Sequence, residues 1–181
     1  HENQMTFVGK IRENYKRLFT SSPEIPHPEV LTIESSYTCN LKCVMCPRHF
    51  EGVPQGVFTL EMFEKHIEPY IKNFKVLSLT GWGEPLMNKD LPEILDRAKK
   101  AGLWTTFITN GLLLKNPLDR KLLEVEPKMI SVSCDAAKAE TYEYVRGKGT
   151  FETLNKRLSS FRELRQTMDV ETEMQWIFVM M

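Results

Sequence analysis

The chain has 181 residues, of which 41% are hydrophobic and 27% are charged. This composition is typical of a globular domain with its own core and excludes a chain that is disordered throughout. Lys plus Arg and Asp plus Glu both number 24, so the net charge is zero and gives no strong signal for nucleic acid or an anionic membrane. No apolar stretch approaches the roughly 20 residues of a membrane-spanning helix.

Short apolar runs alternate with segments of helical periodicity along the chain. They predict strands at 30–36, 76–80, 103–109, 129–135 and 170–180. Between them we expect helices at 59–71, 90–102, 118–125, 141–145 and 151–165. Pro69 should kink or end the first helix, because proline has no amide hydrogen. Asp90 and Glu93 have the spacing of a capping box at the start of the second.

This order of elements predicts an α/β fold with a parallel sheet and right-handed crossovers. An open doubly wound sheet and a barrel both fit the order. The strands favour the barrel, because Ser131 and Ser133 share one face of their strand while Ile130, Val132 and Cys134 share the other. A parallel strand between two helix layers is apolar on both faces. A recurring polar face therefore indicates an incomplete barrel with a ligand on its concave side, although a merely solvent-edged sheet is an alternative.

Three of the four cysteines, Cys39, Cys43 and Cys46, lie within eight residues directly after the first predicted strand. The first twenty residues do not form an export signal, so the clustered thiols indicate a reducing cytoplasm and a metal or cluster site. One candidate is zinc, with His49 as a fourth ligand. Another is an iron–sulfur cluster, in which three protein ligands leave one iron open. Cys134 is expected to be a buried core residue.

The spacing Cys39-x-x-x-Cys43-x-x-Cys46 after a first strand resembles the signature of the radical S-adenosylmethionine (radical SAM) superfamily. Gly81-Trp82-Gly83-Glu84-Pro85, after the second strand, resembles the Gly-Gly-Glu-Pro segment of that family, with Trp82 as a departure from the double glycine. The other matching segments are Thr109-Asn110-Gly111, Ser133-Cys134-Asp135 and Tyr144-Val145-Arg146-Gly147. The last of these, with Cys46-Pro47-Arg48, resembles the SPASM-type branch that matures peptides and proteins.

The resemblance implies a partial, TIM-like (β/α)6 barrel with five of its six strands present. Residues 30–181 would be the radical SAM core, incomplete at its C-terminus, and residues 1–29 an N-terminal extension. The apolar run at the end of the chain likewise suggests a fragment of a longer protein. Trp104 and Trp176 are expected to pack inside the fold.

The implied cofactors are a [4Fe-4S] cluster on Cys39, Cys43 and Cys46 and S-adenosylmethionine on the open iron. The residues implied to bind S-adenosylmethionine are Met45, Gly83, Glu84, Thr109, Asn110, Ser133 and Arg146. In this interpretation Gly83 lets the backbone approach the ligand, because it has no Cβ. Glu84 would accept from the ammonium group of the ligand, and Arg146 would pair with its carboxylate.

The implied activity is reductive cleavage of S-adenosylmethionine to a 5′-deoxyadenosyl radical, which abstracts hydrogen from a substrate such as a peptide or protein. A one-electron donor such as flavodoxin or ferredoxin and a cytoplasmic location go with this activity. One alternative is a non-catalytic iron–sulfur or zinc-binding module. Another is a tRNA- or cofactor-modifying radical SAM enzyme, although the neutral charge balance argues against a nucleic-acid substrate.

Overall fold

The computed structural model describes residues 28–49, 55–147 and 150–179. Five strands form one parallel sheet in the order β1-β2-β3-β4-β5. Their bounds are β1 (Val30–Ile33), β2 (Val76–Leu79), β3 (Trp104–Thr109), β4 (Met129–Ser133) and β5 (Glu173–Ile177). The predicted strands are therefore all present, in chain order across the sheet. Most of the predicted extension, residues 1–27, lies outside the described residues.

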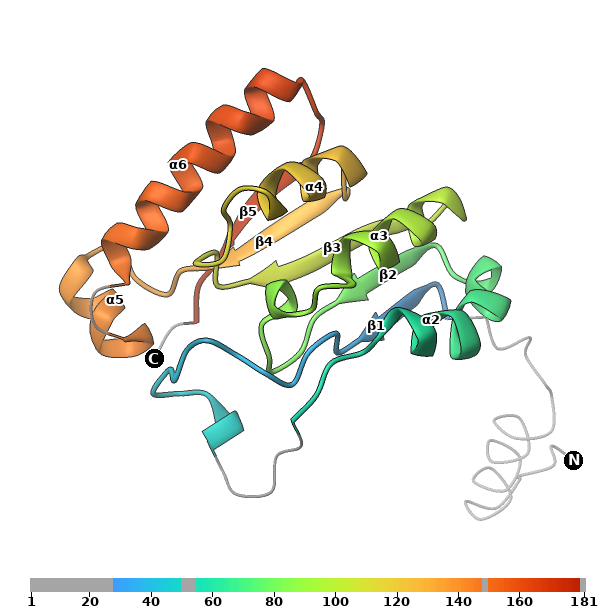
Figure 1. The fold of residues 1–181 in the computed structure, drawn as a ribbon. Helices are drawn as coiled ribbons and strands as arrows, with labels where there is room; N and C mark the ends of the chain where they lie inside the picture. Colours follow the sequence, from blue (N-terminus) through green and yellow to red (C-terminus); the bar gives the residue numbers. More distant parts are fainter. Residues whose placement is uncertain (1–27, 50–54, 148–149, 180–181) are drawn as a thin grey trace, which may run out of the picture.

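Helices connect successive strands and lie along one side of the sheet (Figure 1). They are α2 (Leu60–His66), α3 (Leu91–Lys100), α4 (Leu118–Val125), α5 (Ala139–Arg146) and α6 (Phe151–Met168), with short 3-10 segments η1 (Pro47–His49), η2 (Glu68–Asn73) and η3 (Pro85–Met87). Neighbouring helices contact one another in the pairs α2–α3, α3–α4, α4–α6 and α5–α6. None of the helices in the described residues has both the length and the apolar character needed to cross a bilayer.

The core lies between the sheet and these helices. Side chains of alternate strand residues, such as Leu77, Phe107 and Ile130, point toward the helices and are fully buried. The opposite parity carries a row of hydroxyl side chains, in which Thr32, Ser78 and Thr106 are register partners. Thr32 is exposed, and Ser78 and Thr106 are half-buried. The sheet thus has one apolar, helix-covered face and one polar face, as the alternation in the sequence predicted for a partial barrel.

Three local expectations have a definite outcome. Helix α2 ends at His66, before Pro69, as predicted. The capping box at the start of α3 is wrong: Asp90 makes no side-chain cap and instead accepts a hydrogen bond from the Leu60 amide at 3.1 Å. Its carboxylate therefore joins two helices. Cys134 is buried in the hydrophobic core, as expected.

The expectation that Trp104 and Trp176 pack inside is also wrong, because they are 65% and 54% exposed. Trp104 pairs in register with Val76 on the polar face, which no described helix covers. Trp176 lies on β5, which has a described neighbour, β4, on one side only. Hydrophobic character predicted burial, but position in the sheet decides it.

We expect Phe107→Ala to lower the free energy of unfolding by about 3–5 kcal/mol, because it leaves a cavity under the central strand β3. Urea unfolding followed by circular dichroism measures this change. Trp104→Ala on the same strand is the matched control and should cost less than about 1 kcal/mol. Equal losses in the two variants would contradict the assignment of the two sheet faces.

Candidate cofactor site at the carboxyl ends of the strands

A cavity of about 210 Å³ lies where the loops after β1, β2, β3 and β4 meet. Every residue that the sequence predicted for the site lines it: Cys39, Cys43, Met45, Cys46, Gly83, Glu84, Thr109, Asn110, Ser133 and Arg146. Leu41, Pro47, Trp82 and Ile108 complete its walls. A larger cavity of about 350 Å³ beside α6 and β5 has no cysteine or carboxylate in its walls. Another cavity, of about 420 Å³ between α3 and α4, has carboxylates in its walls but no cysteine, so the three cysteines are what distinguish the cavity at the strand ends.

The loop that carries the three cysteines folds around one guanidinium group. Arg48 donates hydrogen bonds to the carbonyl oxygens of Tyr37, Cys39 and Leu41, at 3.2, 3.5 and 3.4 Å. The loop is also tied to the end of α5, because the amide of Val44 donates to a backbone carbonyl there at 3.0 Å. In Figure 1 this loop (blue to cyan) runs close to α5 (orange). Local polar contacts thus hold the cysteines on one cavity wall.

Nitrogen donors face two of the three sulfurs. The Leu41 amide lies 3.4 Å from Cys39 Sγ, and the Asn110 side-chain amide lies 3.9 Å from the same atom. The Arg146 guanidinium donates to Cys43 Sγ at 3.6 Å. Burial raises the pKa of Cys39 and of Cys43, and Arg146 acts against this rise at Cys43. The donors therefore favour the thiolate form that a metal ligand needs, against the effect of burial.

The donor set fits an iron–sulfur cluster. Three free thiols line one cavity, thiolates are the ligands that iron–sulfur clusters prefer, and N–H groups directed at the sulfurs are the usual surroundings of such ligands. In the described residues these three thiols are not gathered into a group that could hold a metal ion, so the fit lies in the ligand types and their N–H surroundings and not in the positions of the sulfurs. The side chain of His49, the fourth ligand of the zinc alternative, lies outside the described residues.

Glu84 joins the loops after β2 and β3. Its carboxylate is only 2% exposed and accepts hydrogen bonds from the Thr109 hydroxyl at 2.6 Å and the Asn110 amide at 2.8 Å. A third bond comes from the Leu86 amide at 3.1 Å. Burial raises the pKa of Glu84, and these hydrogen bonds lower it again in part. The predicted role of Glu84 toward a ligand stays a prediction, since its observed partners are all groups of the protein.

The structure itself requires a glycine at position 83. A Cβ at this position would overlap the Ser36 carbonyl and lie 2.9 Å from the Thr38 carbonyl oxygen. The Glu84 amide, next in sequence, donates to that Thr38 oxygen at 2.8 Å. The missing side chain therefore lets two loops of the protein meet, and the predicted approach of a ligand to Gly83, which lines the cavity, stays a prediction.

Arg146 already has an anionic partner in the structure. Its guanidinium forms an ion pair with Asp135, whose side chain is fully buried. Asp135 has a left-handed backbone (φ 61°), and its other oxygen accepts from the Val179 amide at 2.9 Å. The sequence interpretation placed Asp135 at the end of a motif and did not predict this pairing. A ligand carboxylate at Arg146 would share the guanidinium with Asp135.

The comparisons with known proteins point to one family. The family model described as the Radical SAM superfamily matches residues 33–172. The AdoMet-dependent heme synthase of Methanosarcina barkeri (strain Fusaro / DSM 804) is 35% identical over 127 residues, covering 69% of this chain and 36% of that protein. Mycofactocin maturase MftC of Mycolicibacterium smegmatis (strain ATCC 700084 / mc(2)155) is 32% identical over 127 residues, covering 69% and 32%. The chain thus spans about a third of the length of these relatives.

The solved structures agree on the fold. Streptococcus suis SuiB bound to S-adenosylmethionine superposes with a TM-score of 0.67 at 16% identity, covering 96% of this chain and 37% of that one. Methylornithine synthase (PylB) superposes with a TM-score of 0.53 at 15% identity, covering 87% and 49%. Together with the five parallel strands, this likeness confirms the predicted partial, TIM-like barrel.

We expect Glu84→Ala to lower the free energy of unfolding by about 3 kcal/mol or more, because three buried donors lose their acceptor. Urea unfolding near neutral pH measures the loss. Glu93→Ala is the control: its exposed carboxylate pairs with Arg97 on the same helix, and its loss should cost less than about 1 kcal/mol.

The pH dependence of stability tests the charge of Glu84. Its pKa is raised in the folded protein, so the folded state binds the proton more tightly than the unfolded state does. Its stabilising contribution is full below its ordinary value of 4.5 and declines as the pH rises through the folded pKa. Glu84→Gln should remove this decline from a series of urea unfolding curves. If the pH dependence of stability is the same in Glu84→Gln as in the wild type, the raised pKa of Glu84 is contradicted.

Proposed function

The chain belongs to the radical SAM superfamily, and from this membership we propose that it binds a [4Fe-4S] cluster and S-adenosylmethionine and cleaves the latter reductively. These two are the cofactors of the family. The observation that supports the proposal best is the convergence of ten predicted residues on one cavity. They lie on the loops after β1 and β2, at the ends of β3 and β4 and at the end of α5, near the edge at which parallel sheets bind ligands.

Cys39, Cys43 and Cys46 would hold the cluster through their thiolates, leaving one iron for S-adenosylmethionine. Bound together, the two cofactors would supply one-electron chemistry: with one electron from an external donor, passed through the cluster, S-adenosylmethionine would yield methionine and a 5′-deoxyadenosyl radical able to take a hydrogen atom from the substrate. Arg146, which donates to Cys43 Sγ, would stabilise the negative charge that accumulates on the ligated sulfurs.

Five of the seven residues proposed to bind S-adenosylmethionine fall into two groups, and the other two, Gly83 and Asn110, contact the loop after β1 through their backbone and side chain, respectively. Glu84, Thr109 and Arg146 already hydrogen-bond or pair with other protein groups, so they would hold the ligand while also holding the loops. Met45 and Ser133 line the cavity and make no hydrogen bond through their side chains to other described residues. Their sulfur and hydroxyl would be available to the adenine and to the polar groups of the ligand.

For the substrate we propose a peptide or a protein. Cys46-Pro47-Arg48 and Tyr144-Val145-Arg146-Gly147 support this by their resemblance to the peptide-maturing branch, and one relative is named as a maturase. The relative named as a heme synthase favours a second candidate, an enzyme that modifies a cofactor. In either case we propose a cytoplasmic one-electron donor, such as flavodoxin or ferredoxin, as the reductant.

We expect the chain, reconstituted anaerobically with iron and sulfide, to convert S-adenosylmethionine to 5′-deoxyadenosine and methionine when dithionite is added. Mass spectrometry measures both products. Cys43→Ala should lose the cluster absorbance and at least about 100-fold of the product, because a ligand is missing. Cys134→Ala is the matched control: Cys134 is the one cysteine in the described residues that does not line the cavity, and the variant should keep the cluster.

Two results would contradict the proposed function. One is a wild-type chain that takes up zinc and leaves S-adenosylmethionine intact, which is the behaviour of a non-catalytic binding module. The other is an equal loss of cluster in Cys43→Ala and Cys134→Ala, which would mean that the loss follows general unfolding.

A further inference from the structure

Glu34, which follows β1 and belongs to no motif of the sequence, contacts the backbone of the glycine-containing segment 81–83. Its Oε1 atom accepts hydrogen bonds from two successive amides, those of Trp82 and Gly83, the latter at 3.1 Å. An anionic acceptor makes such bonds stronger than a neutral one does. One carboxylate oxygen thus fixes the orientation of two consecutive peptide groups.

This contact requires a glycine at position 81. A Cβ there would overlap the Cγ and Cδ atoms of Glu34 and lie 2.5 Å from Oε1. Gly81 does not have a left-handed backbone, so the conformation itself does not require glycine. Glycine is required because the Glu34 side chain occupies the space that a Cβ would need. The absence of a side chain at Gly81 therefore leaves the space that the Glu34 side chain occupies.

The same segment is held on its other side as well. Gly83 lies against the Ser36 carbonyl, and the amide of Glu84 donates to the Thr38 carbonyl at 2.8 Å. The backbone from 81 to 84 is therefore enclosed between Glu34 and the loop 36–38. Trp82 lies between the two constrained glycines, lines the cavity and is 53% exposed. This explains why a large side chain is tolerated at 82, while 81 and 83 have no space for one.

We propose that Glu34 is a positioning residue of the cofactor cavity, which holds the segment 81–84 so that the Trp82 indole forms part of the wall that contacts S-adenosylmethionine. The proposal rests on the proposed function, because it takes that molecule as the ligand. Glu34 does not line the cavity and acts only through the backbone that it binds.

The test measures binding of S-adenosylmethionine to the reconstituted, unreduced chain, in which no turnover occurs. Isothermal titration calorimetry gives the dissociation constant. Glu34→Ala and Gly81→Ala should each raise it about tenfold, because each releases or displaces the same two peptide groups. Glu34→Gln should stay within about twofold, because its amide oxygen can still accept both hydrogen bonds. The Glu34→Ala/Gly81→Ala double variant should bind no worse than either single variant.

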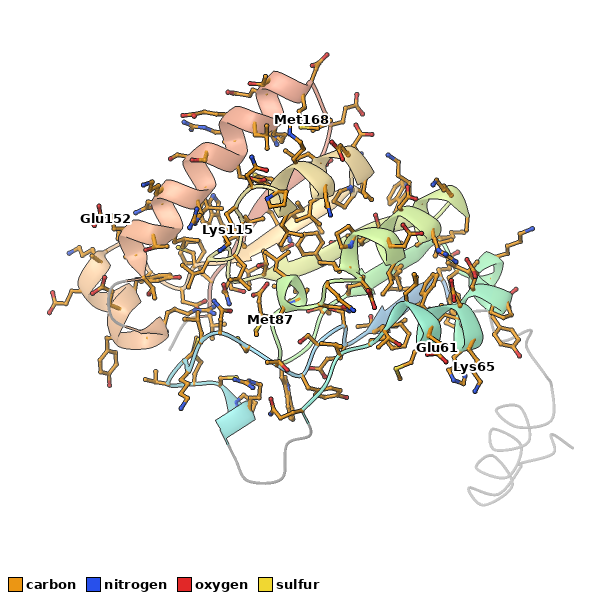
Figure 2. All side chains as sticks on the ribbon, viewed as in Figure 1. Glu61, Lys65, Met87, Lys115, Glu152 and Met168 are labelled. Atoms are coloured by element: carbon orange, nitrogen blue, oxygen red, sulfur yellow. The ribbon has the colours of Figure 1, made fainter. Side chains whose placement is uncertain are left out.

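Glu61→Ala is the matched control for removing a glutamate carboxylate, and it should leave the dissociation constant unchanged. Glu61 lies on α2 beside Lys65 (Figure 2), and neither residue lines the cavity. If Glu34→Ala does not fold, Glu34→Asp replaces it, since the shorter side chain cannot reach both amides from the same backbone position. The expected loss is again about tenfold.

A second readout does not depend on the ligand. In a Trp104→Phe/Trp176→Phe background the only indole left is that of Trp82, because the chain has three tryptophans. Acrylamide quenching of its fluorescence should increase in Glu34→Ala and Gly81→Ala and return to the starting value in Glu34→Gln. Quenching that is the same in all variants would overturn the proposal.

Multiplicative losses in the double variant, or a Glu34→Gln variant as weak as Glu34→Ala, would also overturn the positioning role. A different result would overturn the proposed function: a wild-type chain that carries the cluster but does not bind S-adenosylmethionine. The two failures are distinguishable. When only the positioning role fails, the wild-type chain still binds S-adenosylmethionine; when the proposed function fails, it does not.

Discussion

The buried carboxylate of Glu84 is the interaction on which the cavity depends. A carboxylate in the protein interior is unfavourable unless donors replace the water it has lost, and here three donors from two loops do so. The ends of β2 and β3 are held together as a result. The Asn110 side chain is in turn directed toward the cysteine loop, where its Nδ2 donates to the side-chain Oδ1 of Asn40 at 2.8 Å. One satisfied charge thus organises the walls formed by three of the four loops.

The remaining wall is organised by a second buried charge. Asp135 holds Arg146, Arg146 reaches the sulfur of Cys43, and the other oxygen of Asp135 binds the backbone of Val179 beyond β5. This sequence of contacts connects the last described strand to the first loop of the fold. It also gives Arg146 a partner when no ligand is present, which keeps a buried guanidinium compensated. Glu84 and Asp135 have related roles, because each buried carboxylate binds protein groups and thereby orients residues that line the cavity.

The fold was largely predictable because its information is local. Alternation predicted the five strands and both sheet faces, and the helix 118–125 has the predicted bounds. The errors have tertiary causes: Asp90 caps nothing on its own helix because the Leu60 amide is within reach, and Trp104 is exposed because no described helix covers its face. Motif order also predicted which residues would line the cavity, since parallel strands end at one edge. It did not predict the partners Glu34 and Asp135, because hydrogen-bond partners depend on the paths of loops that have no periodicity. A charged residue directly after the first strand was the only sign of Glu34.

The cavity and the polar face of the sheet are continuous. Ile108 and Ser133 line the cavity and share their strand parity with Thr106 and Ser131, whereas Thr109 belongs to the helix-covered side. The cofactor pocket therefore borders both faces at the strand ends, and only the polar one is free of described helices. Under the proposed function, a substrate would approach the cofactors along this face, which in a closed barrel is the interior. The row of Thr32, Ser78 and Thr106, which core packing does not require, would then place hydroxyl groups along that approach.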